Sequence, residues 1–132
     1  MKYIFYRLAA TLCPHVPARI GFWFFARLGD LAYLFANRES TYFQNLRHVL
    51  GATTPAARVN AVARAGYQNL LKNYFDLFRG HAMTPAKLRE QLAELRGFEH
   101  IENALKQGKG AIIGSAHFGA WDIIIQLAAI YL

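Results

Sequence analysis

The sequence contains a single cysteine, and this shortage argues against two classes of protein. Cys13 is alone among 132 residues, so no disulfide can form within the chain. The five histidines show none of the spacings that are typical of metal ligands, and no second cysteine is available to join them. We therefore expect neither a disulfide-stabilised fold nor a bound metal, and a reducing compartment fits this composition.

Acidic residues are also scarce. Eight Asp and Glu stand against fifteen Lys and Arg, which leaves a formal net charge of +7. Hydrophobic residues make up 55% of the chain and aromatic residues 14%, whereas nucleic-acid-binding proteins are usually more polar, with cations clustered on one element. A basic, apolar and aromatic chain is better suited to an anionic membrane surface. We therefore expect a membrane lipid as a partner and no nucleic acid.

No long hydrophobic run is free of charges. The first twelve residues are apolar but too short to span a bilayer, and no small-residue cleavage site follows them. Residues 18–36 are longer, but Arg19, Arg27 and Asp30 interrupt them, and the last two are spaced to pair on one helical face. We expect residues 1–36 to form apolar helices that associate with a membrane as a monotopic or anchor-like segment. The alternative is a helix buried against another part of the protein.

Proline and glycine divide the rest of the chain into helices. Thr54-Pro55 and Thr84-Pro85 each place a capping residue before a proline, which is a common helix start. Ser40 is a further candidate cap, and Gly51 and Gly108 are candidate helix ends. Together with the spacing of apolar residues, these signals predict helices at about residues 2–12, 18–36, 41–50, 55–80, 85–95 and 98–106.

The C-terminal part differs from the helical region before it. Ala111 to Ser115 is continuously apolar, which predicts a short strand buried on both faces, and an apolar helix is expected from about residue 120. The expected fold class is therefore α/β and rich in helix, with a helical N-terminal region followed by the first strand-turn-helix unit of an α/β domain. We place the boundary after residue 36, so that residues 37–132 belong to this second region.

The turn after the expected strand sets His117 and Asp122 five residues apart. A histidine beside a helix start, with a carboxylate one helical turn further on, can act as a general base whose ring is oriented by the acid. The alternative is an ordinary turn histidine and an acid favoured by the helix dipole. Ser115 is a weaker candidate nucleophile because no Gly-x-Ser-x-Gly motif surrounds it. The nearby glycines precede the strand, which does not match a dinucleotide-binding motif.

Two sequence stretches, residues 104–113 and Ala116-His-Phe-Gly-Ala-Trp-Asp122, resemble the lipid A biosynthesis acyltransferases, the late lauroyl and myristoyl transferases and their relatives. That family's signature is a His followed by four residues and an Asp or Glu, often His-x-Gly-Asn-Trp-Glu. Asn45-Leu46 and Asn73-Tyr-Phe-Asp76 also resemble the family. Ala120 replaces the frequent Asn, and Asp122 replaces the frequent Glu. The resemblance implies that His117 is the catalytic base and Asp122 its orienting acid.

By the same resemblance, the protein would act at the cytoplasmic face of the bacterial inner membrane. It would move a fatty acyl chain from an acyl carrier protein or coenzyme A thioester to a hydroxyl of a lipid A precursor or related glycolipid, with no other cofactor. The family continues past this point, and a lone strand needs parallel neighbours. We therefore expect an N-terminal half that is inactive by itself and needs a C-terminal half or a partner subunit. The alternatives are a non-catalytic membrane-associated helical protein and a docking module.

Overall fold

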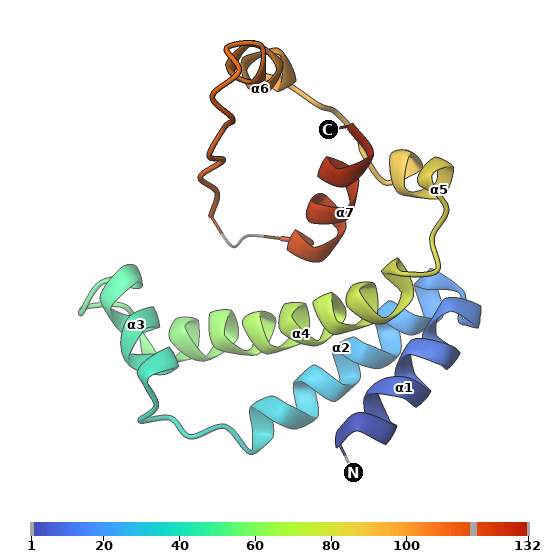
Figure 1. Ribbon diagram of the computed structural model, residues 1–132. Helices are drawn as coiled ribbons and strands as arrows, with labels where there is room; N and C mark the ends of the chain where they lie inside the picture. The colour runs from blue at the N-terminus through green and yellow to red at the C-terminus, as the bar shows by residue number, and fades with distance from the viewer. Residues whose placement is uncertain (1, 117–118, 132) are drawn as a thin grey trace. The chain divides into compact units, whose positions relative to one another are not determined.

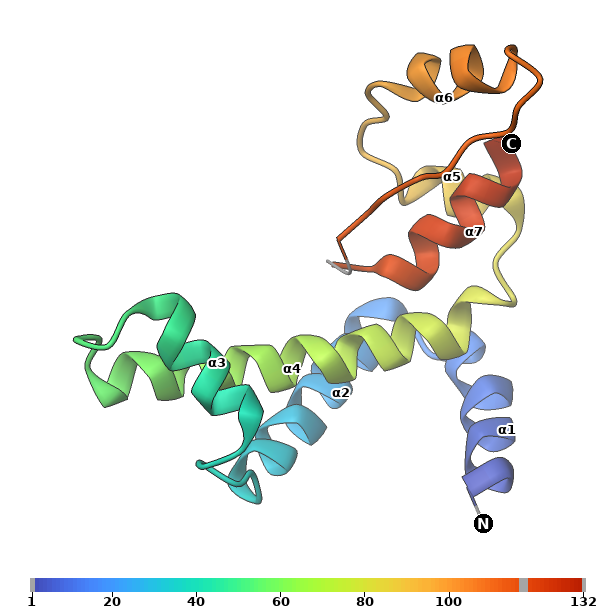
Figure 2. The ribbon, with the colours of Figure 1, turned by 60° about the vertical axis from the view of Figure 1, so that its left-hand side comes forward.

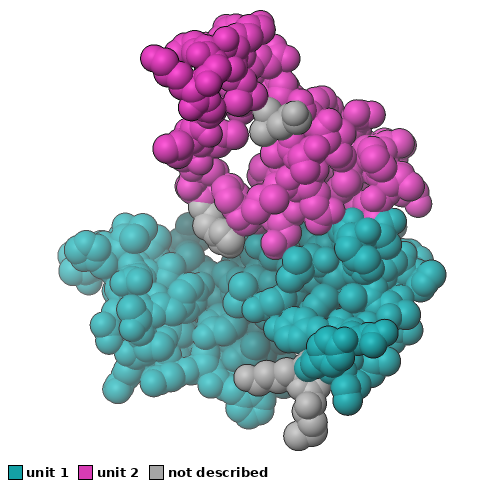
Figure 3. All heavy atoms as spheres, in the orientation of Figure 1, with its two compact units in different colours: residues 1–82 teal, residues 83–132 magenta. Residues whose placement is uncertain are grey.

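The computed structural model describes residues 2–116 and 119–131 of the chain (Figure 1). Its regular elements are helices throughout the described residues. In chain order these are α1 (Lys2–Leu12), the short 3₁₀ helix η1 (Cys13–His15), α2 (Ala18–Leu34), α3 (Thr41–Leu50), α4 (Ala56–Gly80), α5 (Pro85–Glu90), α6 (Phe98–Leu105) and α7 (Trp121–Tyr131). The chain divides into two compact units, an N-terminal unit (Met1–Ala82) and a C-terminal unit (Met83–Leu132), which are coloured separately in Figure 3.

The predicted α/β class is wrong for the part of the chain that the structure describes, because no strand occurs there. The stretch from Ala111 to Ala116, expected to begin with a buried strand, is irregular and exposed, and Ile112 is fully exposed. A strand requires a neighbour that accepts and donates its backbone hydrogen bonds. The described residues supply no such neighbour, so the fold is mainly helical.

Helices α2 and α4 share the most extensive contact in the N-terminal unit and lie alongside each other (Figure 2). Two glycines of α2 permit this packing. A Cβ atom on Gly29 would lie 2.6 Å from the Cα atom of Gln68, and one on Gly21 would overlap the Phe75 ring. Interiors are packed too densely to absorb such overlap without movement. The two helices therefore approach closely only because these positions lack side chains.

Two aromatic clusters fill the N-terminal unit. The first surrounds the fully buried Phe75 of α4 and includes Cys13 and Phe78. The second surrounds the fully buried Phe43 of α3 and includes Val59 and Ala63 of α4. Helix α4 contributes residues to both clusters and therefore connects them.

The helix starts follow local chemistry, with one correction. Thr84 caps α5 as predicted, since its Oγ1 accepts a hydrogen bond of 3.3 Å from the Lys87 N–H. Thr54 was expected to cap α4 but does not. Pro55 occupies the cap position, and the Thr54 hydroxyl donates to the Leu50 carbonyl at 2.7 Å. Ser40 precedes α3 as predicted, although its hydroxyl makes no capping hydrogen bond.

The C-terminal unit has a smaller, aliphatic core. Leu88 of α5 packs with Ile123 and Leu127 of α7. Helix α6 reaches α7 through an edge-to-face contact between the Phe98 and Tyr131 rings, whose centroids are 5.7 Å apart. This unit therefore depends on the pairing of two short helices, α5 and α7.

Candidate functional site

The turn predicted to carry the chemistry leads into α7. Asp122 lies in the first turn of that helix and is partly exposed, whereas Ile123 and Leu127 hold another face of α7 in the aliphatic core. Gly119 precedes the helix with φ of 67°, a left-handed conformation that favours glycine. His117 lies outside the described residues. The pairing of His117 with Asp122 therefore stays a prediction, while the position of the acid at a helix start is observed.

The glycines before this turn have open space around them. Gly108 and Gly110 both have positive φ, and a Cβ atom added to Gly114 would meet no atom within 4 Å. The Ser115 hydroxyl donates to the backbone carbonyl of Ala116 at 3.3 Å, a local contact that does not prepare it as a nucleophile. The segment can therefore approach a ligand closely with its backbone.

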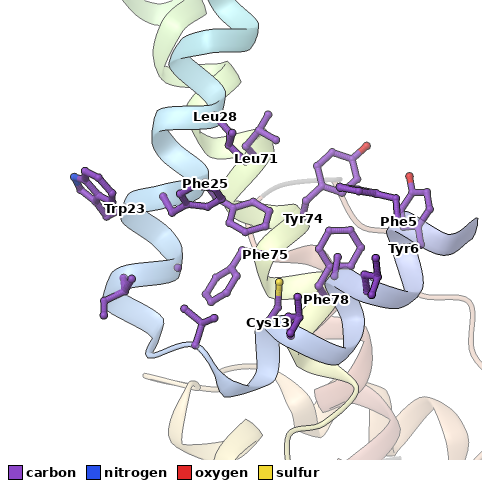
Figure 4. Close-up of a pocket in the computed structure, with 17 residues that line it drawn as sticks. Phe5, Tyr6, Cys13, Trp23, Phe25, Leu28, Leu71, Tyr74, Phe75 and Phe78 are labelled. Carbon is purple, nitrogen blue, oxygen red and sulfur yellow. The ribbon is translucent and has the colours of Figure 1, made fainter. Parts of the chain in front are cut away.

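A large apolar groove lies in the N-terminal unit (Figure 4). Its volume is about 790 Å³, within the range of small-molecule pockets, which is roughly 300–1,000 Å³. Helices α1, α2 and α4 all contribute to its lining, and none of the lining residues is charged. Representative residues, labelled in Figure 4, are Phe5, Cys13, Trp23, Leu71, Tyr74 and Phe78. No sequence pattern predicted this groove, because its lining comes from separate helices.

Charge is divided unequally between the two units. The N-terminal unit contains ten Lys or Arg and three Asp or Glu, whereas the C-terminal unit contains five of each. The entire net charge of +7 therefore belongs to the N-terminal unit. The total is given by the sequence, but its division between the units is not, because the division after Ala82 is seen only in the structure.

One of the few acids in the N-terminal unit joins α2 to α4. Asp30 accepts hydrogen bonds of 2.6 Å from Arg64 Nε and from Gln68 Nε2, and Arg27 forms an ion pair with it at 2.9 Å. The hydrogen bonds from Arg64 and Gln68 lower the pKa of Asp30 to about 2. The predicted pairing of Arg27 with Asp30 is confirmed. Arg64 and Gln68 were missed because they lie 34 and 38 residues away.

A second ion pair lies inside the aromatic cluster around Phe75. Arg79 Nε donates to Asp76 Oδ1 at 2.9 Å, and Asp76 is only 8% exposed. The Arg79 guanidinium also lies over the Phe22 and Phe75 rings, 5.0 and 5.3 Å from their centroids. Asp76 ends the Asn73-Tyr-Phe-Asp stretch that carried part of the family resemblance, and it pairs with Arg79, whose guanidinium contacts Phe22 of α2.

Two further features are absent from the described residues. No helix there is both long and apolar enough to cross a membrane. Nor do three or more His, Cys, Asp or Glu side chains come together there as metal ligands.

In physical terms the chain is a basic, mainly helical protein with a large open apolar groove and an acid at a helix start after a small-residue turn. It matches the model of the bacterial lipid A biosynthesis acyltransferase family over residues 2–131. The chain belongs to this family, as the resemblance in the sequence predicted.

Curated relatives agree with this assignment. Over 81 residues the chain is 33% identical to a phosphatidylinositol mannoside acyltransferase of Mycobacterium tuberculosis (strain CDC 1551 / Oshkosh). It is 32% identical over 80 residues to a protein of the same name from Mycolicibacterium smegmatis. Each match covers 61% of this chain, but only 25% and 26% of the two relatives, so the chain spans about a quarter of their length. No solved structure matches the chain.

Proposed function

We propose that the protein takes part in acyl transfer from an acyl thioester, carried by acyl carrier protein or coenzyme A, to a hydroxyl of a glycolipid. The family match over residues 2–131 is the observation that carries this proposal. The family description names lipid A biosynthesis, and the relatives' names specify a phosphatidylinositol mannoside. Both acceptors are glycolipids, and we propose that this chain acts on a lipid A precursor or a related glycolipid.

In the proposed reaction, His117 removes the proton from the acceptor hydroxyl, and the hydroxyl oxygen attacks the thioester carbonyl. The carbon–sulfur bond breaks, the new ester forms, and the thiol leaves with a proton returned by the imidazole. Asp122 orients the imidazole and stabilises its protonated form. The position of Asp122 at the start of α7 supports this role, because backbone N–H groups at a helix start favour negative charge.

The test of this mechanism is transfer of a labelled acyl group to a glycolipid extract by the native gene product in membranes. We expect His117→Ala to lower the rate by about 10²- to 10⁴-fold, which is typical for loss of a general base. Asp122→Asn should lower it by the same factor or less without unfolding the protein. His100→Ala, at an exposed position on α6, is the matched control and should leave the rate unchanged. Near-normal turnover after His117→Ala would reject the mechanism.

We also propose that the N-terminal unit holds the protein on an anionic membrane, at the cytoplasmic face of the bacterial inner membrane. Two features support this. The unit carries the whole net charge, and α1 and α2 expose many large apolar side chains, including those of Tyr3, Ile4, Trp23 and Leu34. Apolar side chains inserted at the headgroup boundary, with cations beside them, are typical of helices that lie in a membrane surface.

Flotation with lipid vesicles tests this attachment. The chain should float with phosphatidylglycerol vesicles, bind phosphatidylcholine vesicles less, and lose part of its binding at high salt. Trp23→Ser should weaken binding, whereas Ile112→Ser, at a fully exposed apolar position in the C-terminal unit, should not. Recovery of the chain as a soluble monomer without detergent would contradict the proposal.

A further inference from the structure

The apolar groove of the N-terminal unit is open, and its walls include exposed side chains. Trp23 is 63% exposed, Phe24 is 51% exposed, and Leu8 and Leu12 of α1 are also more than half exposed. Exposed apolar patches of this extent on a protein surface usually mark a binding site for a partner or a lipid. The floor, by contrast, is closed by the buried residues Cys13, Phe75 and Phe78.

We propose that this groove holds one hydrocarbon chain of an anionic membrane phospholipid. The chemistry of the lining supports a hydrocarbon, since no charged side chain lines it and its few polar atoms belong to Tyr, Trp and Cys residues. Each CH₂ group buried against such a lining leaves water, which is favourable, so a hydrocarbon of many such groups gains a large total. A polar or charged ligand would lose its hydration there without gaining partners.

The exposed wall of the groove indicates that the hydrocarbon chain comes from the bilayer. Its exposed wall residues belong to the same helices, α1 and α2, that carry the apolar surface proposed to lie on the membrane. A hydrocarbon chain of a bilayer lipid can therefore enter the groove without crossing water. The exposed Arg7 and Arg19 belong to the same two helices as the lining residues Leu8 and Ile20, and cations on a membrane-facing helix favour an anionic headgroup. This inference rests on the membrane attachment proposed above.

Native mass spectrometry of the full chain, purified in detergent and mixed with palmitoyl-oleoyl phosphatidylglycerol, tests the proposal. We expect one retained lipid per chain. Leu8→Ser combined with Leu12→Ser makes the lining more polar at two exposed positions and should reduce the retained lipid about tenfold. Leu31→Ser combined with Leu34→Ser is the matched control, because these exposed leucines of α2 lie outside the groove. This control should retain lipid as the unchanged chain does.

Each other outcome would overturn the proposal. Retention of no lipid, of several lipids in a random distribution, or of equal amounts by both double variants would mean that the groove is not a lipid site. A lipid-free dimer would identify a second copy of the chain as the occupant. Displacement of the lipid by an equal concentration of palmitoyl coenzyme A would assign the groove to a thioester donor. A chain that floats with vesicles but retains no lipid would refute this inference while leaving the proposed attachment intact.

Discussion

The two units of this chain differ in the residues that form their cores and in their net charge. The N-terminal unit has two aromatic clusters, a close helix pair and the entire net charge. The C-terminal unit is neutral, has one aliphatic cluster, and carries the irregular segment with the fully exposed Ile112. The unit with the larger core is thus the one proposed to bind lipid, and the unit with the smaller core carries the proposed chemistry. Loosely packed regions are commonly where binding loops and catalytic turns occur.

The largest expected effect is on the core of the N-terminal unit. Phe75→Ala removes a fully buried ring that contacts Phe22 and Phe25, and it should cost about 3–5 kcal/mol. Leu127→Ala in the C-terminal unit should cost about 2 kcal/mol, the lower end for its type. Hydrogen exchange followed by mass spectrometry reports the two units separately. We expect each substitution to lower protection mainly in its own unit, and equal loss in both units would contradict this expectation.

The next largest effect on stability is expected where α2 approaches α4 closely. Helix propensity alone predicts that Gly29→Ala stabilises the chain by about 1 kcal/mol. Because the new Cβ atom would lie 2.6 Å from the Gln68 backbone, we expect instead a loss of about 1–3 kcal/mol. Gly114→Ala, where the added atom meets open space, is the control and should change stability by less than about 0.5 kcal/mol. Chemical denaturation of the variants decides the sign.

A smaller effect on stability is expected at two helix caps, Thr84 in the C-terminal unit and Ser40 in the N-terminal unit. Thr84→Ala removes a hydroxyl that accepts the Lys87 N–H, and it should cost about 1 kcal/mol. Ser40→Ala removes a hydroxyl that is buried without a hydrogen-bond partner in the described structure, so it should be neutral or slightly stabilising. Thermal unfolding of both variants compares them, and an equal loss would show that Ser40 does cap α3.

The smallest effect concerns pH. The pKa of Asp30 is lowered to about 2 from a usual 3.8, so its contribution to stability is complete above about pH 4 and is lost as pH falls through about 2. Asp30→Asn should therefore lower stability at neutral pH, and its difference from the unchanged chain should shrink on acidification. Glu39→Gln, at an exposed acid, is the control. A difference that stays constant down to pH 2 would contradict this role for Asp30.

Local signals predicted the helices well because they depend on neighbouring residues. The bounds of α1 and α3 agree with prediction, and α6 ends one residue early, whereas α2 ends two residues and α5 five residues before the predicted end. Gly51 ends α3 with φ of 96°, as expected for a glycine stop. The error at Thr54 has a specific cause, since α4 begins one residue later than predicted and Pro55 takes the cap position. Capping residues indicate candidate helix starts, and the conformation of the surrounding backbone determines which residue begins the helix.

Features that join distant residues were not predictable in the same way. The Asp30 network and the groove lining need the crossing of α2 with α4, which no short sequence window contains. The strand failed for a related reason, since continuous apolar residues predict a strand only where neighbouring strands exist. For the candidate site, sequence placed Asp122 correctly at a helix start, and its pairing with His117 stays a prediction.

The chain has two tryptophans, and the division into units gives each unit one of them. Trp23 lies on the wall of the apolar groove and is largely exposed, whereas Trp121 begins α7 and is partly buried. Tryptophan emission shifts to shorter wavelength in an apolar environment, so each ring reports on its own surroundings. The Trp121→Phe chain would follow filling of the groove as a blue shift, and the Trp23→Phe chain would follow the start of α7 next to the proposed catalytic turn. The protein thus carries a separate optical probe for each of its two proposed activities.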